Sequence, residues 1–547
     1  MTIPIRVSRR SAIGARVHDG ESVIRDRLTR VRWSLLVFAT LGIATLVTRL
    51  PGVVFSGMFD RDESYLSVMG DSLRSGGEMY ITFIDRKPPI VPYIYAAVRS
   101  VGVDMRLVRL ICALLIFANG VVVTLIVRKL VARRSAALAA GTLSVVGASL
   151  FLPVDAQAAN FELWGLLPAS AAMLFVVSSR ADAQHAWRWF GLAGAALMLA
   201  VNCKQPYIVV VFPIAWEIFR QQRNWSRNLL AAMAGAAMAV VPLALIVDLG
   251  LMWRWVWTDN VDYLDGGIST VRALGVGLGL TAVFVGFHLP LFYGVWAGLT
   301  RRVRLDATMV VWGLASVLAI PIGLRFFGHY YQQLVPPLAV LSGIGLSVAT
   351  RRAWRFVAGL TAALAFALVG LAFVHRPDLS NFTALGRYIQ ATTTTNERIV
   401  VWGALPDVYV SAERQPAGVF LHAGYLTGNW ASRSTNLGPA VVASEPYSSR
   451  WRIFLEDIRT DPPTLIIDAA RPGTDWSRYA PGSYPIGALM TRCYRFDAQI
   501  DGLPIWRLDN KACPGGLGVP DESRDNRSDN RSDNRSDNGK DAAVDDQ

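Results

Sequence analysis

Residues 107–127 read LVRLICALLIFANGVVVTLIV, and the basic run RKLVARR follows at residues 128–134. A membrane-spanning α-helix needs about 20 mostly apolar residues to cross the hydrocarbon core of a bilayer. Arginine and lysine collect in the cytoplasmic connections between such helices. This stretch therefore predicts a transmembrane helix that ends in the cytoplasm.

Apolar runs of this kind recur through the first two thirds of the chain. Hydrophobic residues make up 52% of its 547 residues and charged residues only 17%, whereas a water-soluble globule carries about 25% charged residues. The chain is therefore predicted to be a polytopic α-helical membrane protein with about eleven spans, of which the fifth and sixth also read as one broken pair. The spans are expected at residues 34–47, 107–127, 136–154, 161–177, 188–203, 206–219, 229–249, 275–299, 307–324, 334–349 and 356–374.

Basic residues alternate from one connection to the next. If the amino terminus is inside, the connections expected in the cytoplasm carry Arg128, Lys129, Arg133, Arg134, Arg180, Arg188, Arg220, Arg223, Arg227, Arg301, Arg302, Arg304, Arg351, Arg352 and Arg355. The short external connections carry only Lys204, Arg254, Arg272 and Arg325. This asymmetry predicts a cytoplasmic amino terminus and, with an odd number of spans, an external carboxyl-terminal part. It also assigns the net charge of +13 to a membrane and not to nucleic acid.

The composition divides the chain into four parts. A basic cytoplasmic segment is expected at residues 1–32 and the transmembrane domain at residues 33–375, with its first external loop at residues 56–106. A small external α/β domain is expected at residues 376–515. Residues 516–547 contain the repeat Arg-Ser-Asp-Asn, which has no apolar side chain to bury, and they predict a disordered tail.

Short β-type runs separated by Pro and Gly support the α/β expectation. Strands are expected at residues 398–403, 464–468 and 504–508, and an amphipathic helix at residues 448–460.

Ionisable residues gather in the connections that are expected outside. Asp62 and Glu63 follow the first span, and Lys87 precedes a stiff Pro-Pro pair. The later external connections add Asp155, Glu162, Lys204, Arg325, His329 and Tyr330. A carboxylate that accepts a proton, beside cations that bind a phosphate, is the chemistry that sugar transfer from a lipid phosphate requires.

Structural roles are possible for the same residues. The Asp62–Glu63 pair is typical of a solvated loop, and Lys204 of a side chain that reaches the interface. Asp155 and Glu162 could also cap a helix. His329 and Tyr330 could also belong to an aromatic belt at the membrane interface. No local spacing of His, Cys and Asp predicts a metal site. No cofactor is expected, although the sequence leaves a divalent metal open.

The first external loop resembles a known family. Asp62-Glu63-Ser-Tyr65, then Gly76-Gly-Glu-Met-Tyr80, then Asp85-Arg-Lys-Pro-Pro89 is similar to the multi-span glycosyltransferases of the GT-C fold. Within them it resembles the bacterial dolichyl-phosphate-mannose–protein mannosyltransferase-like group, which also includes aminoarabinose lipid A transferases and lipopolysaccharide galacturonosyltransferases. Lys204-Gln205 and the run from Phe327 to Pro337 are also similar to features of this group.

The resemblance implies an inverting transfer of sugar from a polyprenyl-phosphate donor to a glycan, lipid or protein acceptor, on the periplasmic face of a bacterial inner membrane. It implies that Asp62 is the base, that Glu63 orients the acceptor and that Lys87 meets the donor phosphate. Lys204, Arg325 and His329 are weaker assignments to the same site, and Asp155 and Glu162 compete for the acidic position of the second external loop.

Two other function classes fit some of these features. A secondary transporter also has about eleven spans and buried charge, but it places ionisable groups near the bilayer midplane. A polysaccharide polymerase or ligase shares the substrates but lacks the Asp-Glu and Lys-Pro-Pro loop. Cys493 and Cys513 fall in the part expected outside, where oxidation is permitted, and they are candidates for a structural disulfide.

Overall fold

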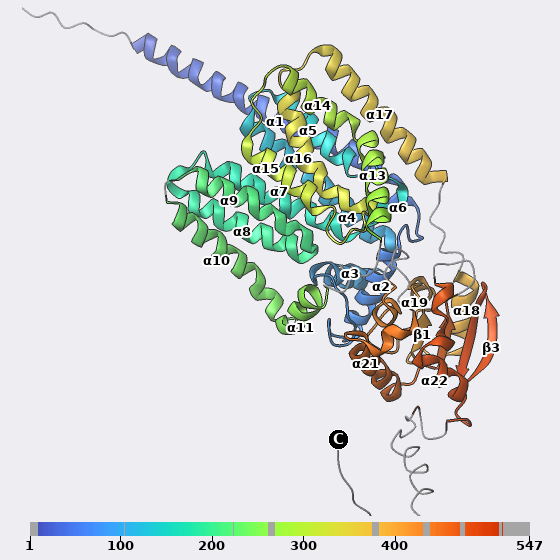
Figure 1. Ribbon diagram of the computed structural model, residues 1–547. Helices are drawn as coiled ribbons and strands as arrows, with labels where there is room; N and C mark the ends of the chain where they lie inside the picture. Colours follow the sequence, from blue (N-terminus) through green and yellow to red (C-terminus); the bar gives the residue numbers. More distant parts are fainter. Residues whose placement is uncertain are drawn as a thin grey trace, which may run out of the picture.

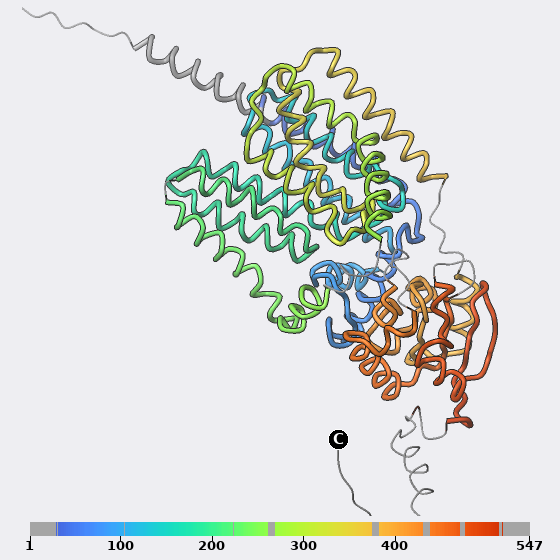
Figure 2. Tube along the Cα trace, viewed as in Figure 1, coloured from blue at the N-terminus to red at the C-terminus, as the bar shows by residue number. Residues whose placement is uncertain are grey.

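A bundle of long helices and a smaller α/β unit make up the molecule (Figures 1 and 2). The computed structural model describes residues 9–513 and Leu517, apart from residues 103, 223, 261–268, 375–381, 430–437 and 471–475. The first eight residues of the expected basic segment, the expected domain boundary at residue 376 and the tail beyond Leu517 lie outside the described residues.

We call residues 9–374 the helical body. Its elements are α1 (Arg9–Val54), α2 (Arg61–Arg74), α3 (Ile90–Val101), α4 (Met105–Leu130), α5 (Arg134–Gly147), α6 (Pro153–Ala156), α7 (Phe161–Ser179), α8 (Ala186–Cys203), α9 (Val211–Arg220), α10 (Trp225–Ala244), α11 (Leu249–Trp253), α13 (Thr270–Phe287), α14 (Leu289–Thr300), α15 (Ala307–Ala319), α16 (Val335–Leu346) and α17 (Arg351–Val374). Helices suit these sequences because a helix satisfies its backbone polar groups internally, which lipid requires.

Six helices among the described residues are long and apolar enough to cross a membrane: Val31–Val54, Met105–Leu130, Phe161–Ser179, Trp225–Ala244, Thr270–Phe287 and Arg351–Val374. Three shorter apolar helices are Ile90–Val101, Leu289–Thr300 and Ala307–Ala319. The membrane character is therefore shown, and the count of about eleven spans stays a prediction.

Several of the expected spans have other bounds in the structure, and two of them contain a helix end well inside the run. The run at residues 275–299 is two helices, α13 and α14, because Pro290 lacks the N–H of a helix interior and its ring crowds the preceding turn. The run at residues 136–154 is helical only to Gly147 in α5, and the short α6 follows.

Loops that are expected on the cytoplasmic side contact one another. Arg133, before α5, donates a 3.0 Å hydrogen bond to the carbonyl of Ser347, after α16. Arg180 at the end of α7 bridges the carboxylates of Glu217 and Asp306, at 2.8 and 2.7 Å. Each of these contacts joins segments that are expected on the same side of the membrane, and the alternation itself stays a prediction.

The α/β unit, residues 382–513, contains a four-stranded sheet in the order β1-β2-β4-β3. Its elements are α18 (Thr383–Thr392), β1 (Ile399–Trp402), α19 (Asp407–Ala412), α20 (Gly424–Thr427), α21 (Tyr447–Thr460), β2 (Leu465–Asp468), α22 (Pro485–Cys493), β3 (Tyr494–Ile500) and β4 (Leu503–Leu508). Strands β1 and β2 are parallel, whereas β4 runs antiparallel to both of its neighbours. The three strands and the helix expected from the sequence correspond to β1, β2, β4 and α21.

Strand β3 was not expected, and it forms a hairpin with β4. The turn consists of Asp501 and Gly502, whose φ angles are 53° and 75°, and such left-handed pairs suit the twist of a two-residue hairpin. A disulfide joins Cys493, at the end of α22, to Cys513.

Candidate active site

A cavity of about 440 Å³ lies between the helical body and the α/β unit. It is lined by Asp60, Arg61, Asp62, Tyr65, Met69, Ile84, Asp85, Arg86, Lys87, Leu152, Val154, Asp155, Lys204, Leu280, Phe327, Gly328, His329, Tyr330, Ala404, Leu421, His422 and Tyr425. A smaller cavity of about 110 Å³ adjoins it, because Arg86, Lys87, Lys204 and Tyr330 line both. Most of the residues singled out in the sequence therefore converge on one place.

Asp62 and Lys87 form an ion pair in this cavity. Lys87 Nζ lies 3.1 Å from Asp62 Oδ1 and 4.2 Å from the centroid of the Phe161 ring. Asp62 lies in the first turn of α2, whose amino end is capped by the carboxylate of Asp60. The two prolines after Lys87 restrict the backbone directly before α3. Both partners are about one fifth exposed and can reach a ligand in the cavity.

Neighbouring charges keep both members of this pair ionised. Burial opposes the charge on Asp62, but the positive charges of Lys87, His329 and Lys204 outweigh it and hold the pKa of Asp62 below its usual range. Burial likewise opposes the charge on Lys87, yet the nearby carboxylates, Asp62 first, raise its pKa. A bound anion would therefore meet a charged Lys87, and Asp62 is an ionised carboxylate with low proton affinity while Lys87 contacts it.

Glu63 does not line the cavity, although it was expected to orient an acceptor. Its carboxylate is fully buried and receives two hydrogen bonds from Arg109, at 2.8 and 2.6 Å. The backbone N–H groups of Phe59 and Ala159 donate to the same carboxylate at 2.8 and 2.7 Å. All of these donors belong to the helical body, so the Glu63 carboxylate anchors α2 in this structure, and its expected role of orienting an acceptor stays a prediction.

Lys204 stands at a break between two helices. Helix α8 ends at Cys203 and a tight helical turn covers residues 205–210, while Lys204 itself has an extended backbone. Its Nζ lies 3.0 Å from Glu162 Oε1 in the first turn of α7 and 5.3 Å from the centroid of the Tyr330 ring. Glu162 and Tyr330 thus hold the second lysine where the two cavities meet.

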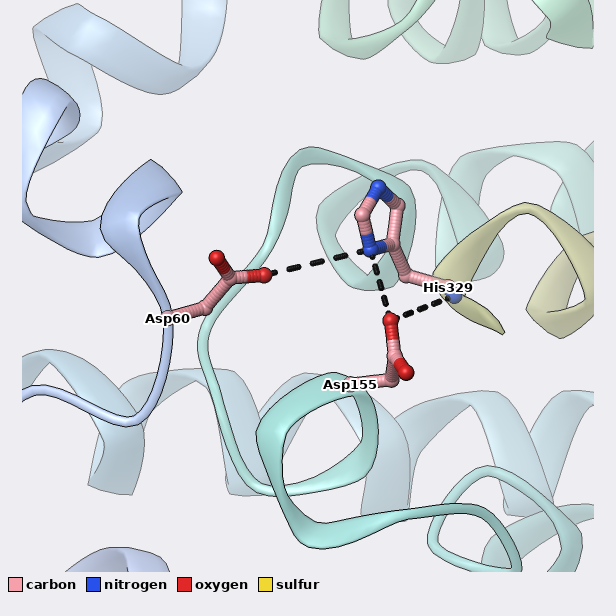
Figure 3. A group of neighbouring side chains, drawn as sticks. All are labelled: Asp60, Asp155 and His329. Atoms are coloured by element: carbon pink, nitrogen blue, oxygen red, sulfur yellow. Dashed lines mark hydrogen bonds and ion pairs between the residues drawn. The ribbon is translucent and has the colours of Figure 1, made fainter. Parts of the chain in front are cut away.

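Asp60, Asp155 and His329 form a compact group beside Asp62 (Figure 3). His329 Nδ1 lies 2.9 Å from Asp155 Oδ1 and 3.9 Å from Asp60 Oδ2. The backbone N–H of His329 also donates a 3.0 Å hydrogen bond to Asp155 Oδ1. One ligand atom from each residue lies within 4.8 Å of the others. Two carboxylates and an imidazole are suitable ligands for Zn²⁺ or another divalent cation.

Neighbouring charges and burial shift the pKa values of two members of this group, His329 and Asp60. Burial lowers the pKa of His329, but the negative charges of Glu162, Asp155 and Asp60 outweigh it and raise this pKa to about 9. Burial and the charge of Asp62 raise the pKa of Asp60 to about 7. A cation would have to displace the imidazole proton, because histidine binds metals as the neutral ring.

Arg325 lines neither cavity, although it was expected to bind phosphate. Its side chain is buried, at 1% exposure. Its two neighbours along the chain, Leu324 and Phe326, both have positive φ angles. Arg325 is therefore not among the residues that line the two cavities, and its expected contact with phosphate stays a prediction.

Several residues of the site were not singled out in the sequence. Asp60 caps α2, Arg86 precedes Lys87, and Arg109 interrupts the apolar run of α4 as a buried charge, which is itself a signal at membrane depth. His422 and Tyr425 come from the α/β unit, and no local pattern points to them.

Comparisons with known proteins bear on the fold. Residues 86–247 match the family model described as dolichyl-phosphate-mannose-protein mannosyltransferase. No curated protein matches the chain in sequence.

Solved structures match nearly the whole chain. ArnT from Cupriavidus metallidurans, bound to undecaprenyl phosphate, superposes with a TM-score of 0.57 at 14% identity, over 89% of this chain and 99% of its own. An Archaeoglobus fulgidus oligosaccharyltransferase, tethered with an acceptor peptide containing the NVT sequon, gives 0.53 at 12% identity, over 85% and 73%. AglB from Archaeoglobus fulgidus, in complex with an inhibitory peptide and a dolichol-phosphate, gives 0.50 at 12% identity, over 89% and 75%. The resemblance predicted from the first external loop is therefore confirmed: the chain has the GT-C fold of membrane glycosyltransferases.

Proposed function

We propose that the protein is an inverting glycosyltransferase that moves a sugar from a polyprenyl-phosphate donor to an acceptor of the cell envelope. The observation that carries this proposal is the ion pair of Asp62 and Lys87, with Lys204 in the same cavity. The lipid phosphates bound to the ArnT and AglB neighbours support the donor class. We place the cavity on the periplasmic side of a bacterial inner membrane, because the charge asymmetry of the loops favours that side.

The donor lipid enters through the smaller cavity. Ala319, the last residue of α15, and Ile322, in the turn after it, line the smaller cavity together with Arg86, Lys87 and Lys204. Ile322 is 47% exposed, so this lining reaches the surface of the helical body. A polyprenyl chain fits beside such apolar side chains, and the two lysines bind its phosphate.

The reaction follows from these positions. The acceptor hydroxyl oxygen forms a bond to the anomeric carbon of the sugar, and the bond from this carbon to the phosphate oxygen breaks with inversion. The electron pair of the broken bond leaves with the polyprenyl phosphate, whose growing charge Lys87 and Lys204 stabilise. The proton of the hydroxyl goes to Asp62.

Donor binding makes Asp62 a better base. Lys87 Nζ contacts Asp62 and lowers its proton affinity. A phosphate that engages Lys87 neutralises part of this positive charge, so the pKa of Asp62 rises when the substrate is present. A divalent cation held by Asp60, Asp155 and His329 would supply additional positive charge beside the acceptor.

Radiolabelled polyprenyl-phosphate sugar and membranes that contain the protein test this proposal. Asp62→Asn and Lys87→Met are expected to lose sugar transfer at normal protein levels. Asp104→Asn is the matched control, because Asp104 also lies at the amino end of a helix and pairs with a cation, Arg106, but at the exposed start of α4. Unchanged transfer by Asp62→Asn, or sugar uptake by proteoliposomes without any transfer, would reject the proposal, the latter in favour of a transporter.

A further inference from the structure

We propose that the α/β unit supplies a binding wall for an uncharged sugar ring of the donor, an inference that rests on the proposed function. The wall consists of Leu421, His422 and Tyr425 of the α/β unit, together with Tyr65 of α2. All four side chains line the larger cavity. The α/β unit would then help to select which sugar is transferred.

Backbone pairing fixes this wall to the phosphate-binding segment. The Ile84 N–H donates a 2.9 Å hydrogen bond to the Val419 carbonyl, and Ile84 pairs with Phe420 in a parallel bridge. Ile84 lies only three residues before Lys87. Because the donor sugar is attached directly to the phosphate, a wall anchored here is within reach of its ring.

Side-chain contacts join the wall to both parts of the protein. The ring of Tyr65 lies 5.3 Å from that of His422, and the ring of His422 lies 5.1 Å from that of Tyr425. The Arg86 guanidinium lies over the Tyr425 ring at 6.0 Å. Beside these contacts, Ser64 on α2 donates a hydrogen bond to Asp407 of α19. The wall is thus held by α2 and by the segment before α3.

His422 presents a hydrogen-bond donor of fixed direction. Its Nδ1 accepts a 3.0 Å hydrogen bond from the Gly424 N–H, so the neutral ring carries its proton on Nε2. Burial, with the charges of Arg86 and Lys87, lowers the pKa of His422 to about 3 and keeps the ring neutral. An Nε2–H group in a cavity is a suitable partner for a sugar hydroxyl.

The chemistry of the wall favours a sugar without charge. Tyr65 and Tyr425 contribute aromatic rings, Leu421 an aliphatic side chain and His422 a neutral donor. None of these four side chains carries a charge, although Arg86 lies over the Tyr425 ring. A sugar ring combines C–H faces with hydroxyl groups and suits this mixture. An ammonium or carboxylate group held against these four side chains would be desolvated without an opposite charge from them, whereas the charged side chains of the cavity, among them Asp85 and Arg86, lie beside the wall.

Equilibrium binding to the purified full-length protein in lipid nanodiscs tests the wall. Two probes are compared: polyprenyl phosphate and polyprenyl-phosphate mannose. His422→Ala is expected to weaken binding of the mannose lipid about tenfold, the value of one hydrogen bond, and to leave binding of polyprenyl phosphate unchanged. His422→Gln is expected to recover part of the loss, because its amide also donates a hydrogen bond.

A control variant and a second probe complete the test. Tyr494→Phe removes a buried hydroxyl that donates to the Pro463 carbonyl at 2.8 Å, on a residue that does not line the cavity, and it is expected to bind both lipids as the wild type does. The inference fails if His422→Ala weakens both lipids equally or changes only the KM of the acceptor. It also fails if an aminoarabinose lipid binds the wild type more tightly than the mannose lipid. None of these results depends on Asp62, whose substitution tests the proposed function separately.

Discussion

Replacing Glu63 tests whether this residue positions α2 or contacts the acceptor directly. Its carboxylate is fully buried and accepts four hydrogen bonds, two from Arg109 and one each from the N–H groups of Phe59 and Ala159. Glu63→Gln replaces one acceptor oxygen by an NH₂ group. Because each oxygen faces one Arg109 nitrogen and one backbone N–H, either orientation of the amide sets this NH₂ against two donors.

The expected loss follows from the burial of both partners. Arg109 remains a buried cation without its anion, and breaking a buried pair in this way costs about 3–5 kcal/mol. Asp104→Asn breaks the exposed pair with Arg106 and is expected to cost less than about 1 kcal/mol. The double variant Glu63→Gln with Arg109→Met removes both charges and is expected to recover part of the loss.

The assay is the free energy of unfolding in mixed micelles of a neutral detergent and sodium dodecyl sulfate, measured together with sugar transfer by the fraction that remains folded. Glu63→Gln is expected to lose stability while its folded fraction retains most of the transfer rate. A variant as stable as the wild type but unable to transfer sugar would refute this reasoning and return Glu63 to direct contact with the acceptor.

Two further results are expected. Zinc is expected to bind at Asp60, Asp155 and His329 and to release the His329 proton at pH 7. After dialysis against Zn²⁺, the wild type is expected to retain about one more ion per chain than His329→Gln. Equal metal content in the two proteins would contradict this assignment. The pKa of His422 is lowered from 6.5 to about 3, so its contribution to stability is complete above pH 6.5 and is lost as the pH falls toward 3. Below pH 6.5 the free energy of unfolding is therefore expected to fall more steeply in the wild type than in His422→Gln, by up to about 1.4 kcal/mol per pH unit. Parallel pH profiles would show that His422 is not buried as a neutral ring.

The sequence predicts the parts of the site that depend on local chain geometry. Asp62 and Lys87 belong to one external loop, and the prolines after Lys87 limit where it can point. Lys204 lies in a connection between two apolar runs, which brings it to the same end of the helical body. The structure joins these three residues in one cavity.

Other parts depend on contacts between distant segments. Asp60, Asp155 and His329 come from three separate connections, so no spacing along the chain reveals them as a group. His422 reaches the cavity because residues 84 and 420 pair as neighbouring backbone segments. Hydrophobic periodicity describes one element at a time and contains no information about such pairing.

Some missed features had a signal in the sequence. Pro290 lies within the run expected as one span and marks the start of α14. Arg109 lies within the most apolar run of the chain, and a cation at that depth needs an anion. Glu63, next to the expected base, is a candidate for this anion. Pairing Arg109 with Glu63 would have assigned different roles to the two carboxylates of the Asp-Glu pair.

Adjacent positions on a helix point about 100° apart, and α2 uses this difference to give Asp62 and Glu63 opposite environments. Asp62 faces the cavity and contacts Lys87, whereas Glu63 faces the helical body and contacts Arg109. The buried pair therefore fixes the first turn of α2, and that turn sets the distance from Asp62 to Lys87. A reaction that requires a base within hydrogen-bonding distance of an acceptor hydroxyl depends on such a fixed turn. This dependence explains why Glu63, which does not line the cavity, lies next to Asp62, which receives the proton.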